Sequence, residues 1–273
     1  MNREQLKALA QETLEISQAG RYAAEDQTVR IGRTQLYTAQ DLERLEAERF
    51  RGIPQSGFDT VYTVRREGTV DTVLNMAGWE RRVPVIGVLN FASAKNPGGG
   101  FLNGAMAQEE SLAYCSDLYL IQTTGPGPRY YEINRACHDP VYTDTMLMGD
   151  VTFFRNSDFT LTHNPVTCKV LTAPAVNMGI VMRNGDSVER AKAVMKGRMR
   201  KVLALFAHWN CTRLVLGAYG CGVFRNDPED VARFWQELLM EEGWGRYFLE
   251  INFSILAKSD EDRNIVPFRR LFG

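Results

Sequence analysis

The chain has 273 residues, of which 44% are hydrophobic, and this length suffices for one large globular domain. Its formal net charge is -1, so it lacks the basic excess that is typical of general nucleic-acid-binding proteins. The five cysteines form no C-x-x-C pair, which disfavours both a disulfide framework and a zinc site. We therefore expect reduced thiols, no metal, no cofactor and no nucleic-acid partner.

The N-terminal stretch MNREQLKALAQETLEIS alternates charged and apolar residues at helical spacing. Residues 3–19 and 39–49 are predicted to be amphipathic helices, with a possible strand around residues 28–31. Because this stretch has no long apolar run, it resembles neither a signal peptide nor a membrane anchor, and we expect a cytoplasmic protein without a membrane partner. Residues 1–57 are predicted to form an accessory region packed on a main domain of residues 58–273.

From residue 58 onward, strand and helix patterns alternate, which indicates an α/β sheet with helices on its faces. Strands are predicted at residues 61–64, 83–89, 166–171, 214–216 and 248–255.

Helix starts are indicated at three places in this region. Thr69 is expected to cap the first helix, Asp186 or Ser187 a long second one, and Asp227 a third that has Pro228 at its first position. Residues 125–150 are rich in Pro, Gly, Tyr and Asp and lack periodicity, so we expect a long ordered loop there.

The segment VLNFASAKNPGGGFLNGAMAQEES, residues 88–111, places three glycines shortly after a predicted strand. In α/β proteins, ligands bind at the carboxyl ends of strands, and consecutive glycines allow the backbone to approach a ligand closely. A P-loop would require Lys followed by Ser or Thr, and a Rossmann fingerprint would require spaced glycines, so neither fits. A flexible turn is the alternative interpretation.

Gln108, Glu109 and Glu110 stand at the expected first turn of a helix, where the helix dipole alone would favour acidic residues. Neighbouring helical residues point about 100° apart, so the two carboxylates are expected to have different roles. With only three histidines in the chain, acid–base chemistry is expected to depend on carboxylates.

The run GGG, a short spacer and QEE resemble the signature of the poly(ADP-ribose) glycohydrolases, in their short bacterial form. The resemblance continues through VLTAPAVNMG (residues 170–179) and LVLGAYGCGVFRNDPEDVA (residues 214–232). It implies a macrodomain-like mixed sheet flanked by helices, and hydrolysis of ribose–ribose bonds that releases ADP-ribose, mainly from chain ends. The implied partners are poly(ADP-ribose) and ADP-ribosylated proteins, and a role in the DNA-damage response is implied by family association.

The same resemblance assigns roles to individual residues. Glu110 corresponds to the acid that protonates the leaving group and then activates water, and Glu109 to the residue that orients the ribose hydroxyls. The other residues implied in substrate binding by the first motif are Asn90, Asn96, Gly98, Gly99, Gly100, Asn103 and Gln108.

A second glycine loop follows the strand at residues 214–216, and its backbone amides could hold a diphosphate. Its members are Gly217, Tyr219, Gly220, Cys221, Gly222 and Val223. In the family, the aromatic that matches Phe224 packs near the distal ribose; an ordinary core phenylalanine is the alternative. Phe268, Tyr130 and Tyr131 are candidates for the adenine contact, and spacing does not choose among them.

Two other functions share much of this pattern. A macrodomain that binds ADP-ribose without cleaving it would have the asparagines and glycines but not the paired glutamates. A hydrolase that removes single ADP-ribose units from proteins would use a related pocket.

Overall fold

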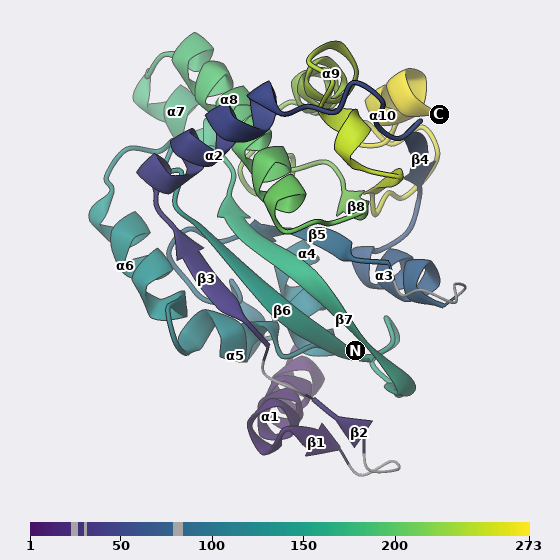
Figure 1. Cartoon of the computed structure of the whole chain (residues 1–273). Helices are drawn as coiled ribbons and strands as arrows, with labels where there is room; N and C mark the ends of the chain where they lie inside the picture. The colour runs from purple at the N-terminus through teal and green to yellow at the C-terminus, as the bar shows by residue number, and fades with distance from the viewer. Residues whose placement is uncertain (23–26, 30–31, 79–83) are drawn as a thin grey trace.

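A seven-stranded mixed sheet with helices on both faces forms the centre of the computed structural model, which describes residues 1–22, 27–29, 32–78 and 84–273 (Figure 1). The α/β class and the flanked mixed sheet predicted from the sequence are therefore confirmed. The strands run in the order β3 (Thr34–Tyr37), β6 (Met146–Arg155), β7 (Leu161–Pro174), β5 (Ile86–Ala92), β8 (Arg213–Leu216), β9 (Glu250–Ser254) and β4 (Val61–Arg65).

Five neighbouring strands, from β7 to β4 in this order, are parallel, and β6 and β3 continue the sheet antiparallel. Parallel strands all end at the same edge of a sheet. Since β5 pairs directly with β8, the two glycine-rich segments that follow them emerge side by side.

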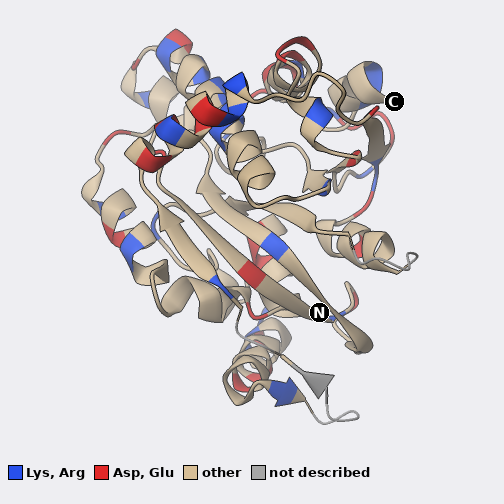
Figure 2. Cartoon of the chain, in the orientation of Figure 1, with Lys and Arg blue, Asp and Glu red and all other residues tan. Residues whose placement is uncertain are grey.

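Alternate residues of the central strands face two separate helix layers. Val88 and Val215 pack in the core beneath one face, and Leu89 and Leu216 in the core beneath the other. The first face is covered by α1 (Arg3–Ala19), α3 (Thr69–Ala77), α4 (Gln108–Cys115) and α5 (Leu118–Thr123). The second is covered by α8 (Val188–His208), α9 (Pro228–Gln236) and α10 (Val266–Phe272). Charged residues lie mostly on the helices in Figure 2, as expected for strands buried on both faces.

The predicted helix starts lie close to those observed. Ser187 caps α8 by accepting from the backbone N–H of Arg190, and Asp227 caps α9 with Pro228 in its first turn. The first of these helices, α3, begins at Thr69 with Gly68 as its N-cap, so Thr69 is not the cap. The remaining elements are α2 (Ala39–Arg51), α7 (Met178–Asn184), η1 (Phe101–Asn103), η2 (Glu237–Glu241), η3 (Trp244–Tyr247), β1 (Arg21–Tyr22) and β2 (Gln27–Thr28).

The prediction of a long loop at residues 125–150 is wrong. This segment contains α6 (Gly127–Ala136) and the first half of β6, joined by residues 137–145. Pro126 and Pro128 lie at the start of α6, where proline is compatible with a helix. Most of β6 is buried on both faces, so it shows no alternation that the sequence could reveal.

Both predicted N-terminal helices are present, as α1 and α2. Of the strand expected around residues 28–31, Thr28 belongs to β2, and residues 30 and 31 lie outside the described residues, as does Val83 of a later predicted strand. Strand β3 was not predicted and forms the edge of the main sheet against β6. The boundary at residue 57 stays a prediction.

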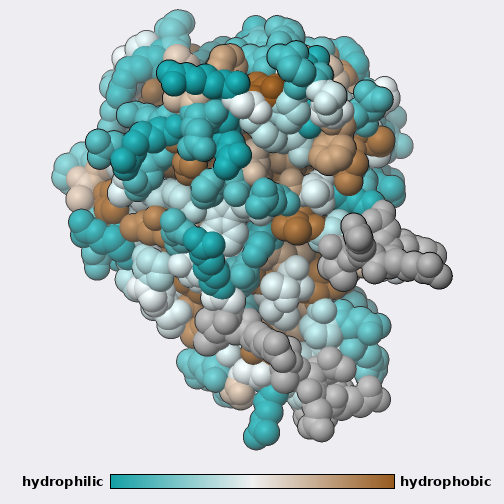
Figure 3. Space-filling model, viewed as in Figure 1, coloured by the Kyte–Doolittle hydropathy of each residue, from teal (hydrophilic) through white to brown (hydrophobic). Residues whose placement is uncertain are grey.

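On the face seen in Figure 3, hydrophobic residues occur in small separated groups among hydrophilic ones. Within the part of the chain that the structure describes, no helix combines the length and the apolar character needed to span a lipid bilayer.

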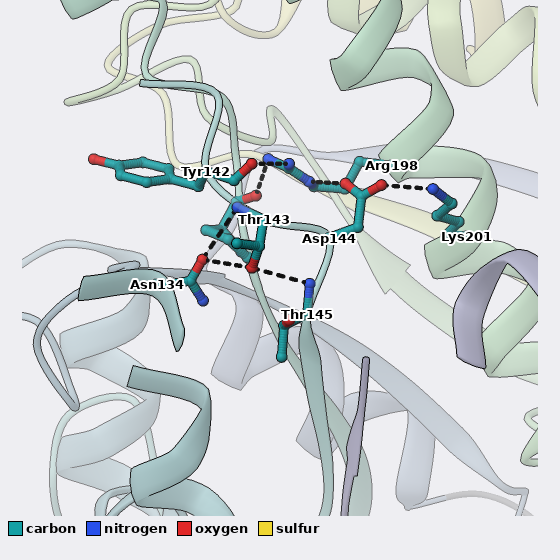
Figure 4. Close-up of polar contacts among 8 residues, drawn as sticks. Asn134, Tyr142, Thr143, Asp144, Thr145, Arg198 and Lys201 are labelled. Carbon is teal, nitrogen blue, oxygen red and sulfur yellow. Dashed lines mark hydrogen bonds and ion pairs between the residues drawn. The ribbon is translucent and has the colours of Figure 1, made fainter. Parts of the chain in front are cut away.

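A buried ionic cluster fixes the segment between α6 and β6 (Figure 4). The guanidinium of Arg198, whose side chain is fully buried, donates to Asp144 Oδ1 (2.9 Å) and to the carbonyl oxygens of Pro174 (2.9 Å) and Tyr142 (3.3 Å). Lys201 Nζ donates to the other oxygen of Asp144 (2.5 Å). Arg198 thus joins α8 to the end of β7 and to the segment that carries Tyr142.

We expect Arg198→Met to lower the free energy of unfolding by about 3–5 kcal/mol, because it leaves the carbonyls of Pro174 and Tyr142 and one oxygen of Asp144 without their partner. Urea denaturation would measure the change. Arg44→Met is the matched control, since Arg44 is exposed and its ion pair with Asp41 is a surface pair, so the substitution should change stability little. Equal effects of the two substitutions would contradict a structural role for the buried cluster.

Candidate active site

The carboxyl ends of β5 and β8 border a cavity of about 270 Å³. Its walls come from both glycine loops and from the first turn of α4, namely Phe91, Ala92, Ser93, Gly99, Ala107, Gln108, Glu109, Glu110, Ala218, Gly220, Gly222, Val223 and Phe224. A second cavity of about 450 Å³ shares Phe91, Ala107, Gln108, Ala218 and Gly222 with the first. The two are therefore adjacent along the same edge of the sheet.

The carboxylate of Glu109 is buried, with 3% of the residue exposed, and accepts three hydrogen bonds. Oε1 accepts from Gln122 Nε2 (2.9 Å) and Asn90 Nδ2 (3.2 Å), and Oε2 accepts from the backbone N–H of Ser93 (2.7 Å). A carboxylate has about four lone-pair sites, so one is left for a ligand in the cavity.

Burial, and to a smaller extent the nearby Glu110, raises the pKa of Glu109, while the hydrogen bonds from Ser93, Gln122 and Asn90 oppose the shift, and the net result is a pKa of about 7. All three partners donate N–H groups, which is the arrangement suited to an ionised acceptor. The carboxyl is thus held near the balance between its two protonation states at neutral pH.

Glu110 has a different environment. Its Oε1 accepts from the backbone N–H of Gly100 (2.7 Å), and its Oε2 accepts no hydrogen bond from the described residues. It lines the small cavity and is 8% exposed. One oxygen is therefore fixed by the first glycine loop and the other can meet a ligand.

Gly99 lies between the two carboxylates. A Cβ at this position would be 2.4 Å from Glu110 Oε1 and 3.2 Å from Glu109 Oε2, and the backbone φ of +59° is one that other residues rarely adopt. The close approach of the loop to both acids therefore requires glycine.

The amides of the first glycine loop are already engaged within the protein. Gly98 N–H donates to Gln122 Oε1 (2.7 Å), Gly99 N–H to the Asn96 carbonyl (3.0 Å) and Gly100 N–H to Glu110. These glycines serve the placement of the carboxylates rather than offering free N–H groups to a ligand.

In the second glycine loop, the amides of Gly220, Gly222, Val223 and Phe224 donate no hydrogen bond to any residue that the structure describes. Gly220 has a φ of +74°, and a Cβ there would lie 2.5 Å from that of Ala175. Asn226 fixes this turn by donating to the carbonyls of Gly220 (3.1 Å) and Val176 (2.8 Å).

Phe224 lines the small cavity and is half-buried, and its ring packs on Tyr142 with centroids 5.9 Å apart. The buried Arg198 holds the backbone of Tyr142, which has a φ of +58°. The ionic cluster of Figure 4 thus fixes the segment that carries Tyr142, on whose ring Phe224 packs.

Gln108 tethers α4 to β5. Its Oε1 accepts from the backbone N–H of Phe91 (2.9 Å), and its Nε2 donates to the carbonyl of Leu89 (2.9 Å). The side chain therefore continues the pairing of the strand and sets the position of the two glutamates that follow it.

Several residues singled out in the sequence do not line either cavity. Asn90 is buried beneath Glu109, Asn96 and Asn103 are exposed, and the Asn103 carbonyl accepts from Arg3 Nε of α1 (2.7 Å). Gly217 is enclosed because a Cβ would lie 2.6 Å from the Ser254 carbonyl. Tyr219 is fully buried, with its ring against Phe91.

The other second-loop residues reach the cavities: Cys221 lines the larger one and Val223 the smaller. The aromatic candidates for adenine, Phe268, Tyr130 and Tyr131, are buried in the cores and line neither cavity.

Sequence reasoning missed Gln122, Ser93 and Thr172. Gln122 is a single amide in the apolar turn LYLIQT, and a polar side chain in such a place requires buried partners, which is a signal that the sequence does carry. Thr172 lies opposite Asn90 in the sheet and accepts from both its amide (3.2 Å) and that of Gln122 (3.4 Å).

The described residues that line the two cavities include four acids, Glu67, Asp71, Glu109 and Glu110, and no Lys or Arg. In residues 1–22, 27–29, 32–78 and 84–273, no three His, Cys, Asp or Glu side chains gather where they could hold a metal ion.

The family model described as "Microbial-type PARG, catalytic domain" matches residues 10–156, more than half of the chain. The chain belongs to this family. Its members are the poly(ADP-ribose) glycohydrolases of the microbial type, a class of glycoside hydrolase, and the resemblance seen in the sequence is confirmed.

Solved structures of this family are similar over nearly the whole chain. Poly(ADP-ribose) glycohydrolase from Thermomonospora curvata is 34% identical with a TM-score of 0.89, covering 99% of this chain and 100% of that one. The structure of the Thermomonospora curvata enzyme bound to the inhibitor ADP-HPD is 35% identical with a TM-score of 0.86, covering 98% of this chain and 99% of that one. The enzyme from Deinococcus radiodurans in complex with ADP-ribose is 38% identical with a TM-score of 0.80, covering 87% and 93%. No curated protein sequence matches the chain.

Gly99→Ala should reduce turnover on poly(ADP-ribose) by about 100-fold or more, because the added methyl group must displace the Glu110 carboxylate. Steady-state kinetics on purified polymer would measure this. Gly185→Ala is a suitable control, since Gly185 also has a positive φ but has open space around it, so only backbone strain is added there. Normal turnover of the Gly99 variant would contradict the close approach.

Proposed function

We propose that this chain hydrolyses the ribose–ribose glycosidic bonds of poly(ADP-ribose) and releases ADP-ribose. The observation that carries the proposal is the pair of carboxylates on either side of Gly99, in a cavity at the carboxyl ends of β5 and β8. A macrodomain that only binds ADP-ribose has no use for two acids in different environments. Membership of the family supports the same activity.

Glu110 is the proposed acid–base residue. Cleavage of the bond between the ribose C1 atom and the departing oxygen develops oxocarbenium-like charge and requires a proton on that oxygen. Glu110 donates this proton from its cavity-facing carboxyl, and then, as a carboxylate, accepts a proton from the water that adds to C1. The second proton transfer restores the acid for the next cycle.

Glu109 is the proposed orienting residue. Its three N–H donors hold the carboxylate in one position, and its remaining lone pair can accept from a ribose hydroxyl at the scissile unit. The buried Asn90 acts through Glu109 by donating to it.

The proposed placement of the ligand follows from the two cavities. The distal ribose occupies the small cavity between Glu109, Glu110 and Phe224. The diphosphate lies along the second glycine loop, whose amides at Gly220, Gly222, Val223 and Phe224 donate to none of the described residues. The adenosine half then extends into the larger cavity, whose volume of about 450 Å³ is in the usual range for ligand sites.

Cytoplasmic location, action on ADP-ribosylated proteins and a role in the DNA-damage response are part of the same proposal. All five cysteines are free thiols in the structure, which is compatible with a reducing compartment. Action on ADP-ribosylated proteins and a role in the DNA-damage response are proposed from membership of the family alone.

Glu110→Gln should lower turnover by about 100-fold or more while leaving ADP-ribose affinity near that of the unmodified enzyme, because the amide keeps the shape but cannot transfer the proton. Release of ADP-ribose from polymer would report turnover, and calorimetry would report affinity. Glu132→Gln, at an exposed position of α6, is the control. If the Glu110 variant turned over normally, another group would have to be the acid.

We further propose that the enzyme cuts mainly at chain ends. Val223 and Phe224 wall the small cavity on the side of the distal ribose, so a ligand that continued past this ribose would meet them. We expect ADP-ribose monomer to accumulate from the earliest time points of a digest of long polymer, while average chain length falls gradually. Chromatography of timed samples would test this, and early oligomers of intermediate length with little monomer would indicate internal cleavage. Phe224→Ala should lower activity and raise the share of internal cuts.

A further inference from the structure

Gln122 is a buried polar residue that the proposed reaction does not use directly. It lies near the end of the short helix α5, outside the two glycine motifs, and its side chain is fully buried. Neither cavity is lined by it. A buried amide is stable only if both its donor and its acceptor find partners.

Both ends of the Gln122 amide have a partner in the active site. Its Oε1 accepts from the backbone N–H of Gly98 (2.7 Å), and its Nε2 donates to Glu109 Oε1 (2.9 Å) and lies 3.4 Å from Thr172 Oγ1. The reverse orientation would place the amide oxygen against a carboxylate oxygen and the NH2 group against an N–H. The contacts with Gly98 and Glu109 therefore together determine the orientation of the Gln122 amide.

We infer that Gln122 is a positioning residue of the active site, whose amide joins the first glycine loop to Glu109 and so fixes the carboxylate relative to the loop that holds Glu110. This inference rests on the proposed function, and it extends that function to a residue outside the motifs.

The loop has a specific need for such a link. Gly98 and Gly99 have φ values of +61° and +59°, and glycines in succession lose the most conformational freedom on folding. The bond from Gly98 to Gln122 anchors the first of them, two residues before the amide that binds Glu110. A displacement at Gly98 is thus transmitted to both carboxylates.

Gln122 also affects the charge of Glu109. The titratable groups that act on or near this carboxyl are Glu110 from α4 and Tyr130 and Tyr131 from α6, none of which supplies a positive charge. Burial raises the pKa of Glu109, and the N–H donors of Ser93, Gln122 and Asn90 lower it. Loss of one donor, or its replacement by a carboxyl, should therefore raise that pKa.

Two variants change the geometry and the electrostatics of the link in different proportions. Gln122→Glu keeps the size and one oxygen for Gly98 but faces Glu109 with a second carboxyl, whereas Gln122→Met keeps the approximate size and removes both hydrogen bonds. Thr123→Val is the matched control, because among the described residues the Thr123 hydroxyl bonds to the carbonyls of Tyr119 and Leu120, both within α5. Thermal unfolding would confirm that each variant is folded.

The readouts are kcat and KM on purified polymer between pH 5 and pH 9, and ¹³C NMR titration of the Glu109 carboxyl in the ligand-free enzyme. We expect Gln122→Met to lower kcat by about 10- to 100-fold at every pH, with a smaller change in KM. In Gln122→Glu, the rising limb of kcat/KM and the NMR midpoint should both move to higher pH, because Glu109 ionises later beside another carboxyl. Thr123→Val should resemble the unmodified enzyme.

Unchanged kinetics and an unchanged NMR midpoint in folded Gln122 variants would overturn the inference, as would an equal loss in Thr123→Val. Failure of the unmodified enzyme to release ADP-ribose would instead overturn the proposed function. In that case, the NMR titration would still decide whether Gln122 controls Glu109.

Discussion

The close approach of a glycine backbone to two carboxylates is the constraint on which the proposed active site depends. Gly99 leaves space that a single methyl group would fill, and Glu110 occupies that space against the N–H of Gly100. The glycine run therefore has a different use from that in phosphate-binding loops, since its amides bond to protein acceptors. The paired acids and the three glycines form one unit, which explains why they occur so close together in the sequence.

The fold supplies this unit with supports from several directions. Gln108 fixes the start of α4 to β5, and the N-terminal helix α1 contacts the turn between the glycines and α4 through Arg3. On the opposite side of the cavity, Arg198 holds the segment whose Tyr142 ring lies against Phe224. The Arg3 contact lies at the surface, whereas the Gln108 and Arg198 contacts are at least partly buried, and together they connect the site to α1, β5 and α8.

The sequence predicted the parts of the structure that have strong local signals. Helix periodicity, the caps at Ser187 and Asp227, and the strand before the glycine run are local features, and the three motifs together identified the family. Strand β6 and helix α6 were missed because a strand buried on both faces has no alternation and a helix that begins with prolines looks like a loop. Gln122 was missed because its role depends on Gly98 and Glu109 being brought to it by the fold.

The charge of the cavity walls has a consequence for the conditions in which this site can work. Because the described residues that line the two cavities include four acids and no Lys or Arg, a diphosphate would be held by backbone dipoles of the second glycine loop. At an ionic strength of 0.1 M, dissolved ions largely screen interactions between exposed charges that are more than about 10 Å apart. They have little effect on short hydrogen bonds to fixed amides. Binding of the polymer end should therefore not weaken as ionic strength rises, in contrast to proteins that hold the same polyanion through clusters of basic side chains.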